Sequence, residues 1–215
     1  MEAITWIERI TDETNPWLNA IKKEEEDDLP LAAELYLKDA GECLKRSAFI
    51  KAALSCSCAA DCLAKVGQLD KALLLYSEAA KLYLENADFV IGKSVRESLW
   101  SLREAHAYFL LAEDNLASRQ VYDRLIHLAS RVGQNIGNEE MPQVPRARTS
   151  IIGGKHIKEP LPINNSADIL ASLEQFLRLR RSRDRLGTSS APSTAMTAGR
   201  RRGPVNEESI ISQLG

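Results

Sequence analysis

The chain has 215 residues, 44% of them hydrophobic and 27% charged, and its formal net charge is −2. No segment approaches the roughly 18 consecutive apolar residues that a membrane-spanning helix needs, and the charged residues near the start do not fit a signal peptide. Four cysteines in a chain without a secretion signal indicate reduced thiols. These properties exclude a membrane-spanning protein and a disulfide-bonded secreted scaffold, and they predict a cytoplasmic protein.

Charge is distributed unevenly along the chain. Residues 1–28 carry a net charge of −6, residues 29–140 a net charge of −2, and residues 141–215 a net charge of +6. The densest acidic run, Glu24–Asp28, directly precedes Leu29-Pro30, where acidic side chains suit the positive end of a helix. We interpret this run as a solvated approach to that helix, with an acidic partner-binding patch as the alternative.

Apolar residues recur with a period of twenty residues from Leu29 onward. The three sets are Leu29, Ala32, Ala33, Tyr36, Ala40 and Cys43; Phe49, Ala52, Ala53, Cys56, Ala59, Ala60 and Leu63; and Leu69, Ala72, Leu73, Tyr76, Ala79, Ala80 and Tyr83. Each set has the i, i+3, i+4, i+7 spacing of one apolar helix face, although Asp39 stands in the first set where the others have alanine. Short breaks at Ser47-Ala48 and Gly67-Gln68 predict that successive helices are antiparallel neighbours.

The later part of the chain keeps helical spacing but loses the exact period after Ala87. Its pattern predicts one long helix from about Asp88 to Leu111, a polar turn at 113–115 and a further helix that Gly133 ends. The predicted layout in chain order is an N-terminal helix or cap with the acidic approach (1–28), a helical repeat domain (29–136), a Pro/Gly-rich linker (137–165), a basic amphipathic helix capped by Ser166 (166–186), and a disordered tail with a short C-terminal motif (187–215).

Two related helical families resemble the repeat domain. Residues 53–86 match the tetratricopeptide (TPR) pattern at its small and aromatic positions, which are Ala60, Gly67, Ala72, Tyr76 and Ala79. The twenty-residue period, with phrases such as Ala32-Ala33-Glu34-Leu35-Tyr36, makes residues 29–135 resemble more specifically the soluble NSF attachment proteins (SNAPs). This resemblance implies an all-α antiparallel helical repeat stack, a TPR/SNAP-like α-solenoid, that connects a SNARE coiled-coil bundle to a hexameric AAA ATPase in membrane fusion.

The end of the chain agrees with the same resemblance. SNAP proteins end in acidic residues followed by a penultimate leucine that engages the ATPase, and here Glu207 and Glu208 precede the penultimate Leu214. The chain is shorter than a typical family member, and its arginine-rich tail departs from the family pattern.

The four cysteines have a structural interpretation. Cys58 and Cys62 are four residues apart and could share a soft metal ion. Cys43 and Cys56, however, occupy core positions of the repeat, where cysteine packs as a small apolar residue. We therefore prefer packing to metal binding or redox chemistry for all four.

The histidines and the known catalytic motifs lead to a similar conclusion. His106 lies on the apolar stripe of its helix and is expected to be a hydrogen-bonded core or groove residue, whereas His127 and His156 are expected at the surface and in the linker. The sequence has no Ser-His-Asp arrangement, HExxH motif or P-loop. We predict a non-enzymatic protein without catalytic residues, cofactor or metal.

Eight arginines between residues 178 and 202 make the tail basic. Next to an apolar stripe, such a segment suits an anionic membrane surface, nucleic acid or an acidic protein face. The intramolecular alternative is that the basic tail folds back on the acidic N-terminus. The scarcity of aromatic residues weakens the nucleic-acid interpretation.

The sequence therefore favours a protein-binding adaptor, with an accessory protein that binds membrane or nucleic acid through its arginine-rich tail as the alternative. The expected partners are a helical or extended protein segment on the repeat surface and an AAA ATPase at the C-terminus. The candidate partner-binding residues are Leu214, Glu207, Glu208, Arg178, Arg180, Arg181, Arg183 and Arg185.

Overall fold

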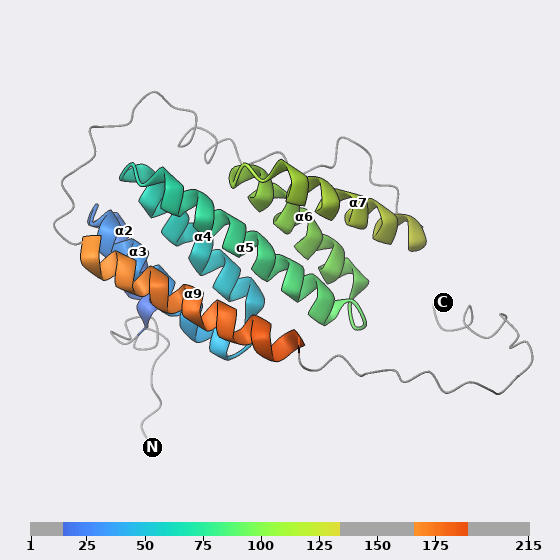
Figure 1. Ribbon diagram of the computed structural model, residues 1–215, viewed down its shortest axis with the longest axis horizontal. Helices are drawn as coiled ribbons and strands as arrows, with labels where there is room; N and C mark the ends of the chain where they lie inside the picture. Colours follow the sequence, from blue (N-terminus) through green and yellow to red (C-terminus); the bar gives the residue numbers. More distant parts are fainter. Residues whose placement is uncertain (1–14, 134–165, 189–215) are drawn as a thin grey trace, which may run out of the picture. The chain divides into compact units, whose positions relative to one another are not determined.

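A computed structural model of the chain describes residues 15–133 and 166–188. Within these two ranges every regular element is an α-helix (Figure 1). The helices are α2 (Pro16–Glu25), α3 (Leu29–Lys45), α4 (Phe49–Lys65), α5 (Leu69–Val90), α6 (Val95–Leu111), α7 (Asn115–Arg131) and α9 (Ser166–Thr188). The all-α class is confirmed, and a helix is present where the basic amphipathic helix was predicted.

Several predictions concern parts of the chain that lie outside the described residues. These are residues 1–14, the predicted linker at 137–165 and the tail from residue 189 onward. The described residues up to Arg181 belong to one compact unit, and the end of α9 from Ser182 belongs to a second.

The same three-residue turn recurs between helices and explains the twenty-residue period. The 17-residue helices α3, α4 and α6 are each followed by a three-residue turn whose middle residue has a left-handed backbone, and α7, also of 17 residues, is followed by the left-handed Gly133. The left-handed residues are Asp27 (φ 61°), Ser47 (φ 58°), Gly67 (φ 82°), Glu113 (φ 59°) and Gly133 (φ 69°). Since only two of these five are glycines, the three that carry side chains accept a backbone conformation that such residues rarely adopt.

The predicted long helix from Asp88 to Leu111 is wrong. Helix α5 continues through Asp88 to Val90 and has 22 residues, and α6 begins only after a break at Ile91–Ser94. The Ser94 hydroxyl caps α6 by accepting a hydrogen bond from the backbone N–H of Glu97 at 3.2 Å. The break was readable in the sequence, because Ser94 and Glu97 have the spacing of a capping box.

The twenty-residue period is interrupted once, between α5 and α6, and then resumes. In α6 the residues at the offsets of the repeat are Val95, Ser98, Leu99, Leu102, Ala105, His106 and Phe109. Of these, all but Val95 are buried. The longer α5 and the longer break after it therefore shift the register, and the twenty-residue unit resumes in α6.

Helices that follow each other in the sequence pack against each other, from α2 on α3 to α6 on α7. Because the connections are short, these neighbours run antiparallel, and the ring of Phe49 at the start of α4 meets that of Phe89 at the end of α5. The paired alanines of the three sets are fully buried or nearly so. Alanine at these positions lets neighbouring helices approach closely.

Aromatic rings fill the spaces that the alanines leave. Tyr36 packs edge-on against Trp17 of α2 at 5.1 Å between ring centroids. Tyr108 of α6 stacks on Tyr83 of α5 at 5.5 Å and on Tyr76 at 6.3 Å. All four of these tyrosines are at most 3% exposed, so they form part of the core.

At two positions of the repeat a polar residue stands in place of alanine and forms a hydrogen bond. Asp39, which interrupts the first set, accepts a hydrogen bond from Ser55 of α4 at 2.6 Å. His106 stands where the earlier units have Ala40, Ala60 and Ala80, and its Nδ1 lies 2.8 Å from the hydroxyl of Ser118 in α7. The prediction that His106 is a hydrogen-bonded core residue is confirmed.

The acidic run Glu24–Asp28 is more than a solvated approach. Glu24 accepts a hydrogen bond from the Tyr36 hydroxyl at 3.1 Å and forms an ion pair with Lys65 at 2.6 Å. Asp28 caps α3 by accepting from the backbone N–H of Leu31. The run thus joins α2, α3 and α4 at one end of the stack.

A candidate protein-binding face

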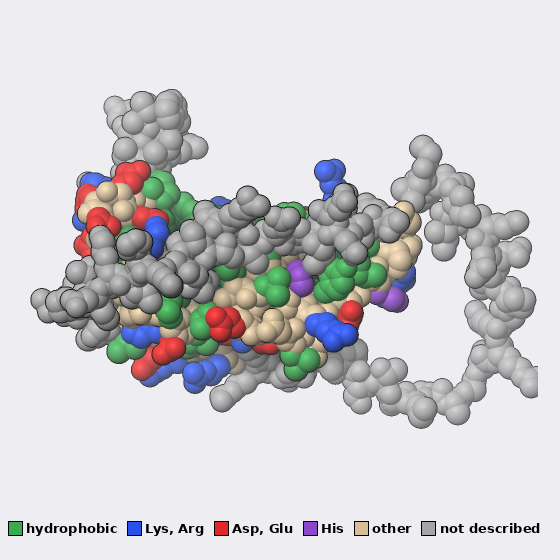
Figure 2. Space-filling view, turned by 90° about the horizontal axis from the view of Figure 1, so that it is seen from above, with side chains coloured by type: hydrophobic (Ala, Val, Ile, Leu, Met, Phe, Trp, Pro, Cys, Tyr) green, Lys and Arg blue, Asp and Glu red, His purple; other side chains and the backbone are tan. Residues whose placement is uncertain are grey.

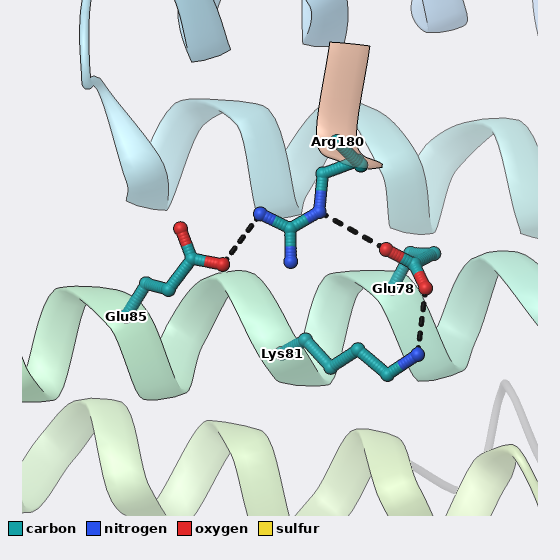
Figure 3. Close-up of polar contacts among 4 residues, drawn as sticks. All are labelled: Glu78, Lys81, Glu85 and Arg180. Atoms are coloured by element: carbon teal, nitrogen blue, oxygen red, sulfur yellow. Dashed lines mark hydrogen bonds and ion pairs between the residues drawn. The ribbon is translucent and has the colours of Figure 1, made fainter. Parts of the chain in front are cut away.

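Helix α9 returns to the stack across a long separation in sequence and contributes an arginine to a buried ion-pair cluster (Figure 3). The Nε of Arg180 donates to Glu78 Oε2 at 3.1 Å, and its Nη1 donates to Glu85 Oε1 at 2.5 Å. Glu78 Oε1 also accepts from Lys81 at 2.7 Å. The two glutamates are seven residues apart on α5 and therefore share one face of that helix.

Arg180 and Glu78 are shielded from water, so losing either partner would leave a buried charge unpaired. The side chains of Arg180 and Glu78 are only 5% and 9% exposed, while that of Glu85 is 31% exposed. Burial disfavours the charged guanidinium, but attraction and hydrogen bonds from Glu85 and Glu78 outweigh it, so the pKa of Arg180 is raised. A buried ion pair adds little net stability, yet removing one partner leaves the other charge buried and costs about 3–5 kcal/mol.

The apolar part of the contact comes from one stripe of α9. Ile169, Leu173 and Phe176 are at most 6% exposed and precede Arg180 at the spacing i, i+4, i+7, i+11. Burying each of these three side chains contributes about 1.5–3 kcal/mol before the entropy of ordering the helix is subtracted. The apolar stripe predicted for this helix, at 169, 170, 173, 176 and 177, is thus confirmed at three positions, whereas Leu177 is partly buried and Leu170 is 42% exposed.

A glycine on α3 makes room for α9. Gly41 is buried, and a Cβ atom placed on it would lie 3.4 Å from Leu179 Cδ1. A larger side chain at this position would occupy the space that Leu179 now fills.

The contact between α3 and α9 is not closed along its length. A cavity of about 370 Å³ lies between the two helices. Its polar and charged lining includes Glu34, Lys38, Glu42 and Lys45 from α3, and Ser172 and Gln175 from α9. Apolar packing is therefore confined to a few residues, with a polar gap beside them.

The predicted partner-binding residues separate into distinct groups. Arg180 is buried in the ion-pair cluster, and Arg178 is exposed and pairs with Glu174 at 3.3 Å within α9. Arg181 is exposed and Arg183 is partly buried. The side chain of Arg185 and all of Glu207, Glu208 and Leu214 lie outside the described residues.

The intramolecular alternative for the basic tail takes an unexpected form. The sequence suggested that the tail folds back on the acidic N-terminal residues 1–28. Arg180 instead pairs with Glu78 and Glu85 of α5. Both glutamates were missed in the sequence, because glutamates within a helix usually lie on its solvent-exposed face.

The cysteines behave as packing residues. Cys56 and Cys62 are buried, and Cys43 and Cys58 are partly buried. Burial raises the pKa of Cys62 to about 12, and burial together with Asp39 raises the pKa of Cys43 to about 11. The described residues contain no group of three or more His, Cys, Asp or Glu side chains that could hold a metal ion.

A second, larger cavity lies between the start of α2, the end of α3 and the start of α4. Its volume is about 590 Å³, and its lining includes Trp17, Asp39, Cys43, Arg46, Lys51 and Leu54. Elsewhere, exposed hydrophobic side chains are spread over several helices, and the described part of the face in Figure 2 shows them in separate groups among charged ones.

Comparison with known proteins gives no match: no protein-family model, no curated protein and no solved structure matches this chain. Among the described helices, none combines the length and the apolar composition needed to cross a membrane.

Proposed function

We propose that this chain is a non-enzymatic protein-binding adaptor with a TPR/SNAP-like α-solenoid, which holds a helical or extended partner segment on its repeat surface. The observation that carries the proposal is the recurrence of a 17-residue helix in α3, α4, α6 and α7, with a left-handed three-residue turn after α3, α4 and α6. Stacked units of this kind offer extended surfaces on which partner segments bind.

The more specific proposal follows the resemblance to SNAP proteins. The partner on the repeat surface is then a coiled-coil bundle, and Glu207, Glu208 and Leu214 engage an AAA ATPase in vesicle transport. The test compares capture of the ATPase by the full chain and by a chain that ends at Asn206. Equal capture by the two chains would contradict this version and leave the general adaptor function untouched.

A second candidate function is binding of an anionic membrane surface or nucleic acid through the arginine-rich tail. The observation that favours it is the exposure of Arg178 and Arg181 on α9. The burial of Arg180 removes one arginine from the set available for such binding.

One capture experiment separates the two functions. The full chain is compared with a full chain in which Arg181, Arg200, Arg201 and Arg202 are replaced by alanine, at low and at high salt. The adaptor function predicts a protein partner retained by both chains at high salt. Capture that the substitutions abolish and that high salt removes would support the alternative.

A further inference from the structure

Helix α9 contacts the stack as a bound amphipathic helix would. Its anchors are three large apolar side chains and one arginine on a single stripe, from Ile169 to Arg180. On the stack, Glu78 and Glu85 of α5 receive Arg180, and Gly41 of α3 lies beside Leu179. We call this surface the α3–α5 face.

Particular residues of the α3–α5 face determine which kinds of side chain can bind to it. Glu78 and Glu85 receive different nitrogens of one guanidinium, Nε and Nη1, in a geometry that a single ammonium nitrogen does not reproduce. Gly41 leaves a place for an apolar side chain beside them. In α9 the arginine that the face receives follows three buried apolar residues, so the face fits a helix with large apolar residues at i, i+4 and i+7 and an arginine at i+11.

Two features show that the contact of α9 with this face is not closely packed throughout. The cavity of about 370 Å³ beside it has a largely charged and polar lining, and Leu170 on the same helix remains 42% exposed. In the sequence, 34 residues separate the end of α7 at Arg131 from the start of α9 at Ser166.

We propose that the α3–α5 face is a binding site for a helix of a partner protein that carries this apolar–apolar–apolar–arginine pattern, and that α9 is its intramolecular competitor. The proposal rests on the adaptor function and specifies the site and the partner class. A partner helix binds when it displaces α9, so the apparent affinity is reduced by the fraction of chains in which α9 occupies the face.

The test uses a fluorescent peptide of residues 166–188 in place of the partner helix. The receptors are the full chain and the full chain with Arg180→Glu, in which repulsion from Glu78 and Glu85 releases α9 from the face. We expect the peptide to bind the Arg180→Glu chain more tightly than the wild-type chain. A full chain with Arg181→Glu is the matched control, because Arg181 is exposed, and it should bind the peptide as weakly as wild type.

Matched peptides test the arginine directly. The peptide with Arg180→Glu should bind the released receptor about 30-fold more weakly or worse, while the peptide with Arg181→Glu should keep its affinity within about threefold. Equal binding of the wild-type peptide to the two receptors, with their helical content retained, would overturn the proposal and make α9 a permanent part of the fold.

A second measurement covers the case in which the Arg180→Glu chain does not fold. An isotopically heavy peptide of residues 166–188 is added in excess to the wild-type chain, and hydrogen exchange is followed in the chain's own α9. Faster exchange in α9 alone supports displacement, and unchanged exchange contradicts it. If the peptide fails in both experiments while the wild-type chain still captures a protein partner at high salt, the adaptor function stands and this site is rejected.

Discussion

Helices α3 to α7 and helix α9 are packed by different means. Each helix of the repeat packs on its sequence neighbour, and α3, α4 and α5 carry alanines that are almost completely buried. Helix α9 reaches α3 and α5 from far along the chain, through a few large side chains and a charged cluster, with a cavity beside them. Local, dense packing makes one cooperative body, whereas a sparse long-range contact can open by itself.

The strongest effect is expected from a substitution inside the repeat. Tyr76 is fully buried and its hydroxyl donates to Asp61 at 2.6 Å. Because Tyr76→Ala leaves a large cavity and removes this hydrogen bond, it should lower the free energy of unfolding by about 3–5 kcal/mol. Urea unfolding measures the loss.

The control for this substitution lies on the same helix. Leu74 is 39% exposed, so Leu74→Ala should change the free energy of unfolding by only about 0.5 kcal/mol. Equal losses for the two variants would mean that α5 is not packed as described.

A substitution at Gly41 should affect α9 and spare the repeat. Gly41→Leu places a side chain where Leu179 now lies and should weaken the docking of α9 by about 1–3 kcal/mol. Helix α3 itself should gain up to about 1 kcal/mol, because glycine is unfavourable within a helix. Hydrogen exchange resolved by segment measures both effects.

Gly41→Ala separates these two effects. Its Cβ would meet Leu179 Cδ1 at an ordinary contact distance of 3.4 Å, so α9 should remain docked while α3 still gains stability. Release of α9 by Gly41→Ala, or its retention in Gly41→Leu, would contradict the contact between α3 and α9.

Alkaline pH should destabilise the repeat through its buried thiols. The pKa values of Cys43 and Cys62 are raised by burial from an ordinary 9.0 to about 11 and about 12. The folded chain therefore holds protons that the unfolded chain loses, so stability is fully present below pH 9 and falls as the pH rises through 11 and 12. Urea unfolding at pH 7, 9 and 10.5 should show this decline.

Removing one of these thiols tests the cause of the loss of stability at alkaline pH. Cys62→Ala removes one titrating group, so the slope of stability against pH above 9 should be smaller than in the wild-type chain. An unchanged slope would mean that Cys62 does not titrate differently in the folded and unfolded states.

The smallest effect is expected at the surface of α9. Arg178 pairs with Glu174 one helical turn away, and both side chains are well exposed. Arg178→Ala should therefore change the protection of α9 against hydrogen exchange by about 0.3–0.5 kcal/mol. A loss comparable to that of a buried ion pair would show that Arg178 has a structural role beyond this pair.

Much of the repeat was predictable because the sequence patterns that specify it lie close together in the chain. The alanine pairs and the turns at Ser47 and Gly67 recur at a fixed interval, and each element packs on its neighbour in sequence. The break before Ser94 was missed because the apolar spacing of α5 continues through Ala87 and Val90.

The cluster around Arg180 could not be predicted in the same way. Its partners, Glu78 and Glu85, lie about a hundred residues earlier, and no local pattern connects an arginine on one helix with glutamates on another. One signal was available, because Arg180 continues the stripe of Ile169, Leu173 and Phe176 instead of facing away from it.

Native-state hydrogen exchange of the full chain tests most directly whether α9 is separable from the repeat. We predict that the amides from Leu173 to Arg180 open with a lower free energy than those from Ala52 to Leu63 in α4, because α9 can undock while the repeat stays folded. Exchange of both segments with the same free energy, equal to that of global unfolding, would contradict this and show that α9 and the repeat form one cooperative unit.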